Sequence, residues 1–250
     1  MKNIDSILKA SLSPDFSPSE ELNNKILDSC IKEKTAARKK YMSFKSPIVA
    51  ACVMLCCSLT VFAAINFLSP SQVAKIKGDK ALAEAFQSED AVFINETKQS
   101  GGYDVTLLGM ISGKGLTDNV IIRNGDVIDD RTYCVVAIAN SDGTLFKDSM
   151  TVPTFYVSPF IQGYEPQLNN IQTILDGRYF ECVSEGVLYR IIECDSIEKY
   201  TDRIVYIGVT DTTFYNVETF NYNSTDGTME VNKDYDGLSV LFELPLNSSK

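Results

Sequence analysis

One stretch near the C-terminus has the residue types and spacing of a calcium-binding loop. Residues 232–237 read Asn-Lys-Asp-Tyr-Asp-Gly, and Glu243 follows six residues later. Side-chain oxygens therefore stand at the first, third, fifth and twelfth positions of such a loop, with glycine at the sixth. The EF-hand needs a helix on each side, whereas residues 219–222, 229–231 and 240–244 are rich in strand-forming side chains. We interpret the motif as a charged β-turn and predict no metal site.

The second chemical feature is an absence, because the chain contains no histidine. Ser-His-Asp and Cys-His relays, histidine zinc ligands and an imidazole general base are all excluded. No phosphate-binding glycine loop or CxxC pair occurs, and the carboxylates show no recognisable paired pattern. The sequence predicts a protein that is not an enzyme and that uses no cofactor. An external enzyme that relies on carboxylates is the weakest alternative.

Three cysteines, Cys134, Cys182 and Cys194, lie in segments that favour strands. A hairpin that turns at Glu185 and Gly186 would place Cys182 opposite Tyr189, and not opposite Cys194. We therefore expect buried free thiols instead of a disulfide between these two strands.

The elements that would hold these side chains are mostly short strands. Turn pairs such as Asn-Gly at 124–125 and Asp-Gly at 142–143 separate β-branched and aromatic runs. The fold class is predicted to be mainly β, with an immunoglobulin-like β-sandwich over residues 91–250 that could divide into two sub-domains. The predicted strands are 91–97, 103–112, 119–123, 132–140, 155–160, 178–183, 188–194, 204–209 and 238–244.

A helical linker is predicted at residues 69–90, before the first strand. A short helix or turn is expected near 71–76, and Asp79 precedes the helix-favouring run Ala-Leu-Ala-Glu-Ala-Phe as a cap.

An uncharged apolar run separates this domain, residues 69–250, from the N-terminal segment. Residues 48–68 carry no charge, and at about 1.5 Å per residue they would span roughly 30 Å, the thickness of a bilayer core. We predict one transmembrane helix at 47–68, with Pro47 at its start. Basic residues concentrate on its N-terminal side, which predicts a cytoplasmic N-terminus and an extracellular C-terminal domain in a cell membrane. The residues that set this orientation are Arg38, Lys39, Lys40 and Lys45.

Other readings of the apolar run stay open. Val-Phe-Ala at 61–63 could be a signal-peptidase site, and Val-Ala-Ala-Cys at 49–52 resembles a lipoprotein box. A buried helix of a soluble protein is a third alternative. The acidic excess after Leu68 disfavours nucleic acid as a partner, so the basic arm is expected to face lipid headgroups.

Residues 1–46 are predicted to form a cytoplasmic helical arm. Ser17 caps a helix that starts at Pro18 and continues to about Lys40. Its apolar residues make a narrow stripe that needs a partner, and a solvated stalk or membrane-surface helix is the alternative. The stripe consists of Leu22, Ile26, Leu27 and Ile31.

Several segments resemble an uncharacterised family of single-pass membrane proteins of Gram-positive bacteria, whose members are often labelled anti-sigma-factor-like. The resemblance lies in 68–74 (LSPSQVA), 78–86 (GDKALAEAF), 94–97 (INET) and 100–109 (SGGYDVTLLG), with weaker likeness at 156–170 and 200–207. It implies one membrane helix followed by an external domain. Residues 17–34 also look like the short sigma-binding arm of membrane anti-sigma factors. Cys30 is the only cysteine of the arm, so sigma binding would be zinc-independent.

These observations lead to two hypotheses of function. The first is a membrane-anchored regulator, a zinc-independent anti-sigma factor with an extracellular sensor domain. Its arm would hold an extracytoplasmic-function sigma factor through Leu22, Ile26, Leu27 and Ile31, and its outer domain would meet an envelope ligand or a protease. The second is a surface-anchored binding or structural module of the cell envelope that has no sigma partner.

Overall fold

The computed structural model describes residues 67–150 and 152–246, which belong to one compact unit, Ile65–Lys250. This described part is mainly β, as predicted. The predicted cytoplasmic arm and nearly all of the predicted membrane helix lie outside it. Among the described residues, no helix has the length and apolar character that a membrane crossing requires.

Two antiparallel sheets make up most of the described unit. The larger sheet has the order β1-β2-β5-β8-β7 and the smaller one the order β12-β9-β6. The larger sheet contains β1 (Val92–Ser100), β2 (Tyr103–Lys114), β5 (Asp130–Asn140), β8 (Val187–Asp195) and β7 (Arg178–Ser184). The smaller sheet contains β12 (Ser239–Glu243), β9 (Val205–Thr210) and β6 (Tyr156–Ile161).

Smaller elements complete the described residues. They are the hairpin of β3 (Ile121–Arg123) and β4 (Asp126–Ile128), the hairpin of β10 (Phe220–Tyr222) and β11 (Met229–Val231), and the 3-10 helix η1 (Glu198–Tyr200).

Helices α4 (Pro70–Lys77) and α5 (Lys80–Ala85) form where the sequence predicts helices, and local signals explain their limits. Ser69 caps α4 in a reciprocal capping box with Gln72, and Pro70 takes the first helical position. Gly78 ends α4 at φ 85°. The helical segment is part of the folded domain as well as a linker. Its apolar residues are buried against the larger sheet, namely Val73, Ala74, Leu82, Ala83 and Phe86.

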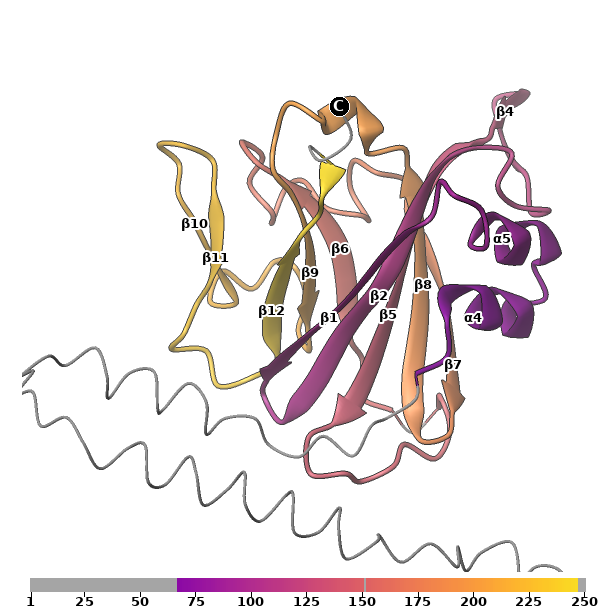
Figure 1. The fold of residues 1–250 in the computed structure, drawn as a ribbon. Coiled ribbons are helices and arrows are strands. Elements are labelled where there is room, and N and C mark those ends of the chain that lie inside the picture. Colours follow the sequence, from indigo (N-terminus) through magenta and orange to yellow (C-terminus); the bar gives the residue numbers. More distant parts are fainter. Residues whose placement is uncertain (1–66, 151, 247–250) are drawn as a thin grey trace, which may run out of the picture. The chain divides into compact units, whose positions relative to one another are not determined.

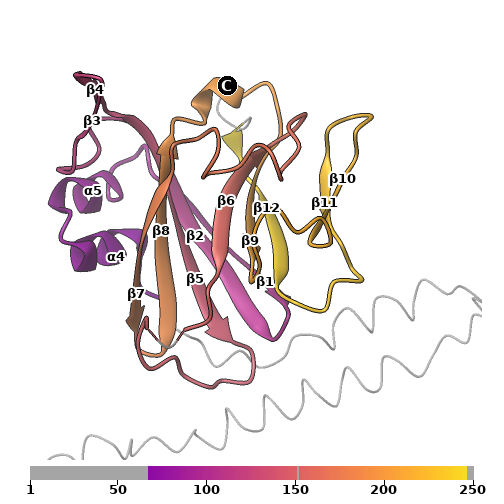
Figure 2. The same cartoon turned by 180° about the vertical axis from the view of Figure 1, so that it is seen from behind.

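Three layers result, with the larger sheet in the middle (Figure 1). The two helices cover one face of this sheet, and the smaller sheet covers the other face, which Figure 2 shows from behind. The middle strands β2, β5 and β8 are therefore buried on both faces along most of their length. Such strands have nearly continuous apolar sequences because no face needs polar residues.

The predicted strands all have counterparts, with ends that coincide or differ by at most three residues. The main omission is β4. Asn124 and Gly125 turn the chain with positive φ angles of 54° and 90°, so that Ile122 lies opposite Val127 in a small hairpin. The predicted strand at 119–123 is correspondingly shorter and begins at Ile121.

The strand order does not confirm an immunoglobulin-like arrangement. In immunoglobulin domains the third strand crosses to the second sheet. Here the first three long strands, β1, β2 and β5, are neighbours in one sheet, and β6 is the first to cross.

Candidate functional site

The most distinct concave feature of the described residues is a cavity of about 470 Å³ at one open side of the two sheets. It lies beside β6 and β7, which are the edge strands of the two sheets. The opposite side is closed by bonds between β1 and the region of β12. Lys98 Nζ donates to the Leu241 carbonyl at 2.5 Å, and the Ser239 N–H donates to Ser100 Oγ at 3.1 Å.

Of the two arginines that line this cavity, Arg178 is exposed and Arg190 is buried at the inner wall. On β8 it lies opposite Val136 of β5 and Glu181 of β7. Val136 belongs to the core between the sheets, so the alternation of side chains along a strand points Arg190 into the same space. Only 4% of Arg190 is exposed.

The Arg190 guanidinium is only partly hydrogen-bonded. Nη1 donates to the Phe155 carbonyl, and Nη2 donates to Oε2 of Glu181 in an ion pair. The Nε–H is buried and has no hydrogen-bond partner among the described residues. A buried N–H without an acceptor costs about 1–3 kcal/mol, and more when the group is charged. Arg190 therefore retains donor capacity that a bound molecule could use.

Tyr179 lies on the outer side of this arginine. Its ring centroid is 4.3 Å from Cζ of Arg190, a cation–π contact, and 62% of the residue is exposed. Tyr179 comes from the start of edge strand β7 and also lines the cavity. The ring covers Arg190 from outside and belongs to neither apolar core.

The remaining walls are mainly apolar and aromatic. Phe155 contacts Tyr103 edge-on with centroids 5.0 Å apart, and Phe214 contacts Tyr156 in the same way at 5.6 Å. Phe155 and Phe214 are buried, which fixes two walls of the cavity. Such an apolar lining with a few polar groups is typical of ligand sites of roughly 300–1,000 Å³.

The loop between β6 and β7 supplies the mouth of the cavity. The Ile171 N–H donates to Ser158 Oγ at 2.9 Å, which fastens the loop to β6. The Gly177 N–H donates to the Ile171 carbonyl at 2.8 Å. A Cβ at position 177 would collide with the Ile171 side chain. Gln172 lines the mouth and is exposed.

Two other polar clusters have structural roles. Buried Arg131 joins three segments, because Nε donates to Glu193 at 3.3 Å, Nη1 donates to Asp195, and Nη2 donates to the Asp176 carbonyl at 2.7 Å. The other cluster surrounds the carboxylate of Asp79.

The Asp79 carboxylate ties the two helices to the segment after β2. It accepts hydrogen bonds from the Leu82 N–H at 3.1 Å, from Lys77 Nζ at 2.9 Å, from Asn119 Nδ2 at 3.0 Å and from Thr117 Oγ1 at 2.5 Å. Burial by itself raises the pKa of Asp79, but these hydrogen bonds outweigh it and hold the pKa well below the ordinary value.

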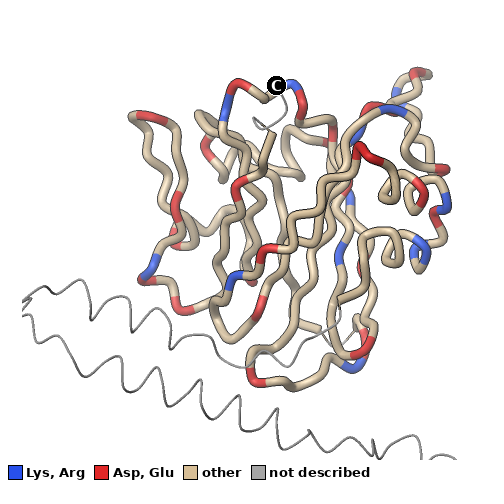
Figure 3. Tube along the Cα trace, in the orientation of Figure 1, with Lys and Arg blue, Asp and Glu red and all other residues tan. Residues whose placement is uncertain are grey.

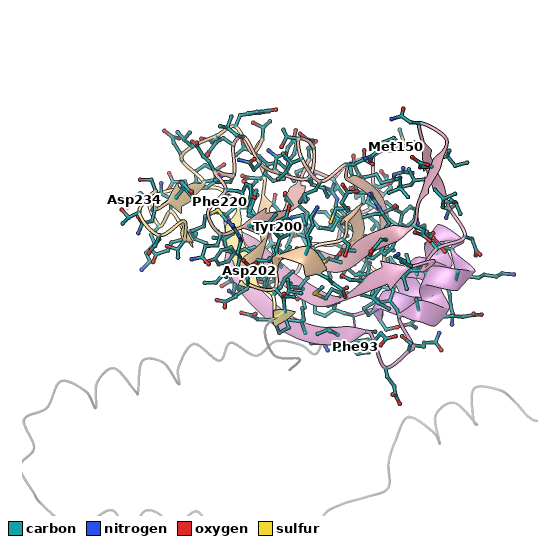
Figure 4. The ribbon with its side chains drawn as sticks, turned by 90° about the horizontal axis from the view of Figure 1, so that it is seen from above. Phe93, Met150, Tyr200, Asp202, Phe220 and Asp234 are labelled. Atoms are coloured by element: carbon teal, nitrogen blue, oxygen red, sulfur yellow. The ribbon has the colours of Figure 1, made fainter. Side chains whose placement is uncertain are left out.

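The calcium-like motif occupies the loop between β11 and β12. Strands flank this loop on both sides, as predicted, and an EF-hand would need helices there. Asn232 Oδ1 accepts the Asp234 N–H at 3.1 Å, which closes an Asx turn. Figure 4 shows Asp234 at the rim of the domain, on the side away from the helices. No cluster of potential metal ligands occurs among the described residues.

The three cysteines within the described residues are free thiols. Cys182 lies opposite Tyr189 in the β7–β8 hairpin, and Glu185 and Gly186 form its turn, as predicted. Burial raises the pKa of Cys194 to about 12 and that of Cys134 well above its ordinary value. These two thiols are therefore unreactive packing groups of the core.

The predicted partner-binding residues Leu22, Ile26, Leu27 and Ile31 lie outside the described residues. The same holds for the orientation residues, which are Arg38, Lys39, Lys40 and Lys45. The cavity itself was not predicted. A signal for it exists, because Arg190 is a charge within the otherwise apolar run Val-Leu-Tyr-Arg-Ile-Ile at 187–192.

Comparison of the chain with protein-family models, with curated proteins and with solved structures gave no match. The residues of the cavity themselves therefore indicate its chemistry. The cavity offers the partly satisfied guanidinium of Arg190, the exposed guanidinium of Arg178 and aromatic walls, which suit binding better than group transfer.

Proposed function

We propose that this chain is a membrane-anchored regulator whose external β domain binds an envelope ligand in the cavity beside β6 and β7. In this proposal residues 1–46 are a cytoplasmic arm, residues 47–68 cross the membrane once, and residues 69–250 form the outer domain. The arm holds an extracytoplasmic-function sigma factor without zinc, through Leu22, Ile26, Leu27 and Ile31.

One observation carries the binding part of this proposal: the apolar cavity with a buried, incompletely bonded Arg190 at its inner wall. A buried polar group without a partner lowers stability, so a domain that only served as a spacer would gain by replacing it. A ligand-binding domain keeps such a group because the ligand supplies the missing acceptor.

The charge of the outer domain is consistent with this role. Acidic positions occur throughout the described chain and outnumber the basic ones (Figure 3). An acidic surface disfavours binding to anionic lipid or nucleic acid, and therefore leaves the cavity as the main recognition feature.

The proposal is tested first by co-purification of the full-length chain from its native host. We expect a sigma factor to be recovered, and recovery to fall when Leu22 and Ile26 are both replaced by aspartate. Recovery of no sigma factor, together with unchanged transcription after deletion of the gene, would contradict the regulatory role.

The binding role is tested by filling the mouth of the cavity. Gln172→Trp places a large ring at the exposed mouth, and Ile174→Trp places the same ring at a nearby exposed position that does not line it. Transcription that depends on the sigma factor should stop responding to growth conditions in Gln172→Trp and should respond normally in Ile174→Trp. Equal behaviour of the two variants would contradict a role for the cavity.

A surface-anchored binding module without a sigma partner is the second candidate, because the same cavity could bind a ligand without any arm. In that case removal of residues 2–34, which keeps the orientation residues, would leave surface binding and transcription unchanged.

A further inference from the structure

We propose that the cavity takes an uncharged peptide segment, with an aromatic or aliphatic side chain between the sheets and a backbone carbonyl on the Nε–H of Arg190. This inference rests on the proposed function, in which the same cavity is the ligand site, and it names the ligand class.

Arg190 has hydrogen-bonding capacity that the described residues leave unused. A guanidinium has five N–H groups, and the described contacts of Arg190 are to the Phe155 carbonyl and to Glu181. The Nε–H is buried and has no acceptor within the part of the chain that the structure describes. A ligand that enters beside it must present an acceptor, because an apolar group there would leave the N–H unsatisfied.

Glu181 determines whether a charged or a neutral acceptor is favoured at this N–H. Its carboxylate already forms an ion pair with Arg190, and Arg190 lines the mostly apolar cavity. A carboxylate ligand at this N–H would bring a second negative charge to Arg190, because the other cation that lines the cavity, Arg178, is exposed to solvent. An unpaired charge in an apolar setting is strongly unfavourable. A neutral carbonyl supplies the acceptor without that penalty.

The position of the cavity favours a peptide as the source of that carbonyl. Strands β6 and β7 are both edge strands, so neither has a second strand neighbour among the described residues. An extended peptide that lies along such an edge can form backbone hydrogen bonds and insert alternate side chains into a neighbouring pocket. The cavity is lined by Phe155, Phe214, Ile171 and Ile192, which suit an aromatic or branched aliphatic side chain.

The experiment uses the full-length chain in mild detergent and four small probes. They are the L and D forms of N-acetyl-phenylalaninamide, which carry two neutral carbonyls, and the L and D forms of N-acetyl-phenylalanine, which carry a carboxylate. Ligand-observed NMR gives the dissociation constant of each. For the wild-type chain we expect the L-amide to bind about tenfold or more tightly than the L-acid, and more tightly than the D-amide.

Glu181→Gln is the decisive variant, because it keeps the shape of the side chain and removes its charge. Arg190 then lacks a counter-ion, and we expect the preference to reverse so that the L-acid binds more tightly than the L-amide. Glu185→Gln, in the turn of the same hairpin and outside the cavity lining, is the matched control and should keep the wild-type order.

Three results would overturn the inference: tighter binding of the acid to the wild-type chain, equal binding of L and D amides, or no reversal in Glu181→Gln. Absence of binding by all four probes would also overturn it. The proposed function is judged separately, by recovery of the sigma factor and by the Gln172→Trp and Ile174→Trp variants, so the two failures are distinguishable.

Discussion

Asp79 shows at the scale of single residues how a buried charge can stabilise the described domain. Its carboxylate is fully buried, caps α5 and accepts side-chain hydrogen bonds from Lys77 of α4 and from Thr117 and Asn119 after β2. A buried carboxylate is tolerated only when such donors surround it.

We expect Asp79→Ala to lower the free energy of unfolding by about 2–4 kcal/mol, because it removes a helix cap and leaves several buried donors without an acceptor. Urea denaturation followed by circular dichroism measures this loss. Asp90→Ala, at an exposed position beyond Ala85, the last residue of α5, should change stability by less than about 0.5 kcal/mol. Equal effects in the two variants would show that the network contributes little.

The same residue predicts a pH dependence. The pKa of Asp79 is depressed in the folded state from an ordinary value of 3.8, so the unfolded chain takes up this proton first. The stability that Asp79 contributes is therefore present above about pH 5 and is lost as the pH falls through 3.8 toward the folded pKa.

Asp79→Asn should accordingly lose less stability than the wild type on acidification over that range. The free energy of unfolding is measured for both chains at several pH values, with Asp90→Asn as the control that keeps the wild-type slope. Parallel curves for wild type and Asp79→Asn would contradict the depressed pKa.

At the scale of elements, the β1–β2 hairpin shows what turn residues can and cannot reveal. Gly101 and Gly102 predict a turn from their types alone, and both have positive φ angles, 56° and 83°. Their surroundings differ, because a Cβ on Gly101 would lie 2.3 Å from the backbone nitrogen of Leu238, whereas a Cβ on Gly102 meets nothing within 4 Å.

Gly101→Ala should therefore destabilise the chain by about 3 kcal/mol or more, through both an unfavourable φ and a clash with backbone. Gly102→Ala should cost about 1 kcal/mol, from φ alone. Denaturation midpoints in urea compare the two. Similar losses would mean that the contact between this turn and the chain before β12 can relax easily.

The contrast between Gly101 and Gly102 also shows which parts of the fold can be predicted from the sequence. Strand positions follow from local β-branched and aromatic runs, and the register of Cys182 with Tyr189 follows from one turn. The order of the strands, and the side on which the two sheets stay open, cannot be predicted in this way. They depend on contacts between residues distant in sequence, such as the hydrogen bond from Lys98 to the Leu241 carbonyl.

The cavity was missed for the same physical reason. The role of Arg190 depends on the Phe155 carbonyl, 35 residues away, and on Glu181 across the β7–β8 hairpin. A charge within an apolar strand indicates that something unusual occurs there, but only the packed structure shows which donors remain unused.

At the scale of the whole molecule, the proposal requires the arm and the outer domain to lie on opposite sides of one membrane. The orientation depends on basic residues close to the apolar run, because the positive-inside rule counts charges within about 15–20 residues of a span. Arg38, Lys39, Lys40 and Lys45 all precede the run within that distance.

We therefore expect an N-terminal epitope tag to be protected from protease in intact protoplasts and a C-terminal tag to be accessible. Replacing Arg38, Lys39, Lys40 and Lys45 together by glutamine should leave some chains inverted, because the charge difference across the span is then mostly lost. The same number of lysine-to-glutamine changes at exposed positions of the outer domain, far from the run, should leave the orientation fixed. Accessibility of both tags, or of neither, in the unsubstituted chain would contradict a single crossing, and a regulator that acts across the membrane would then lose its physical basis.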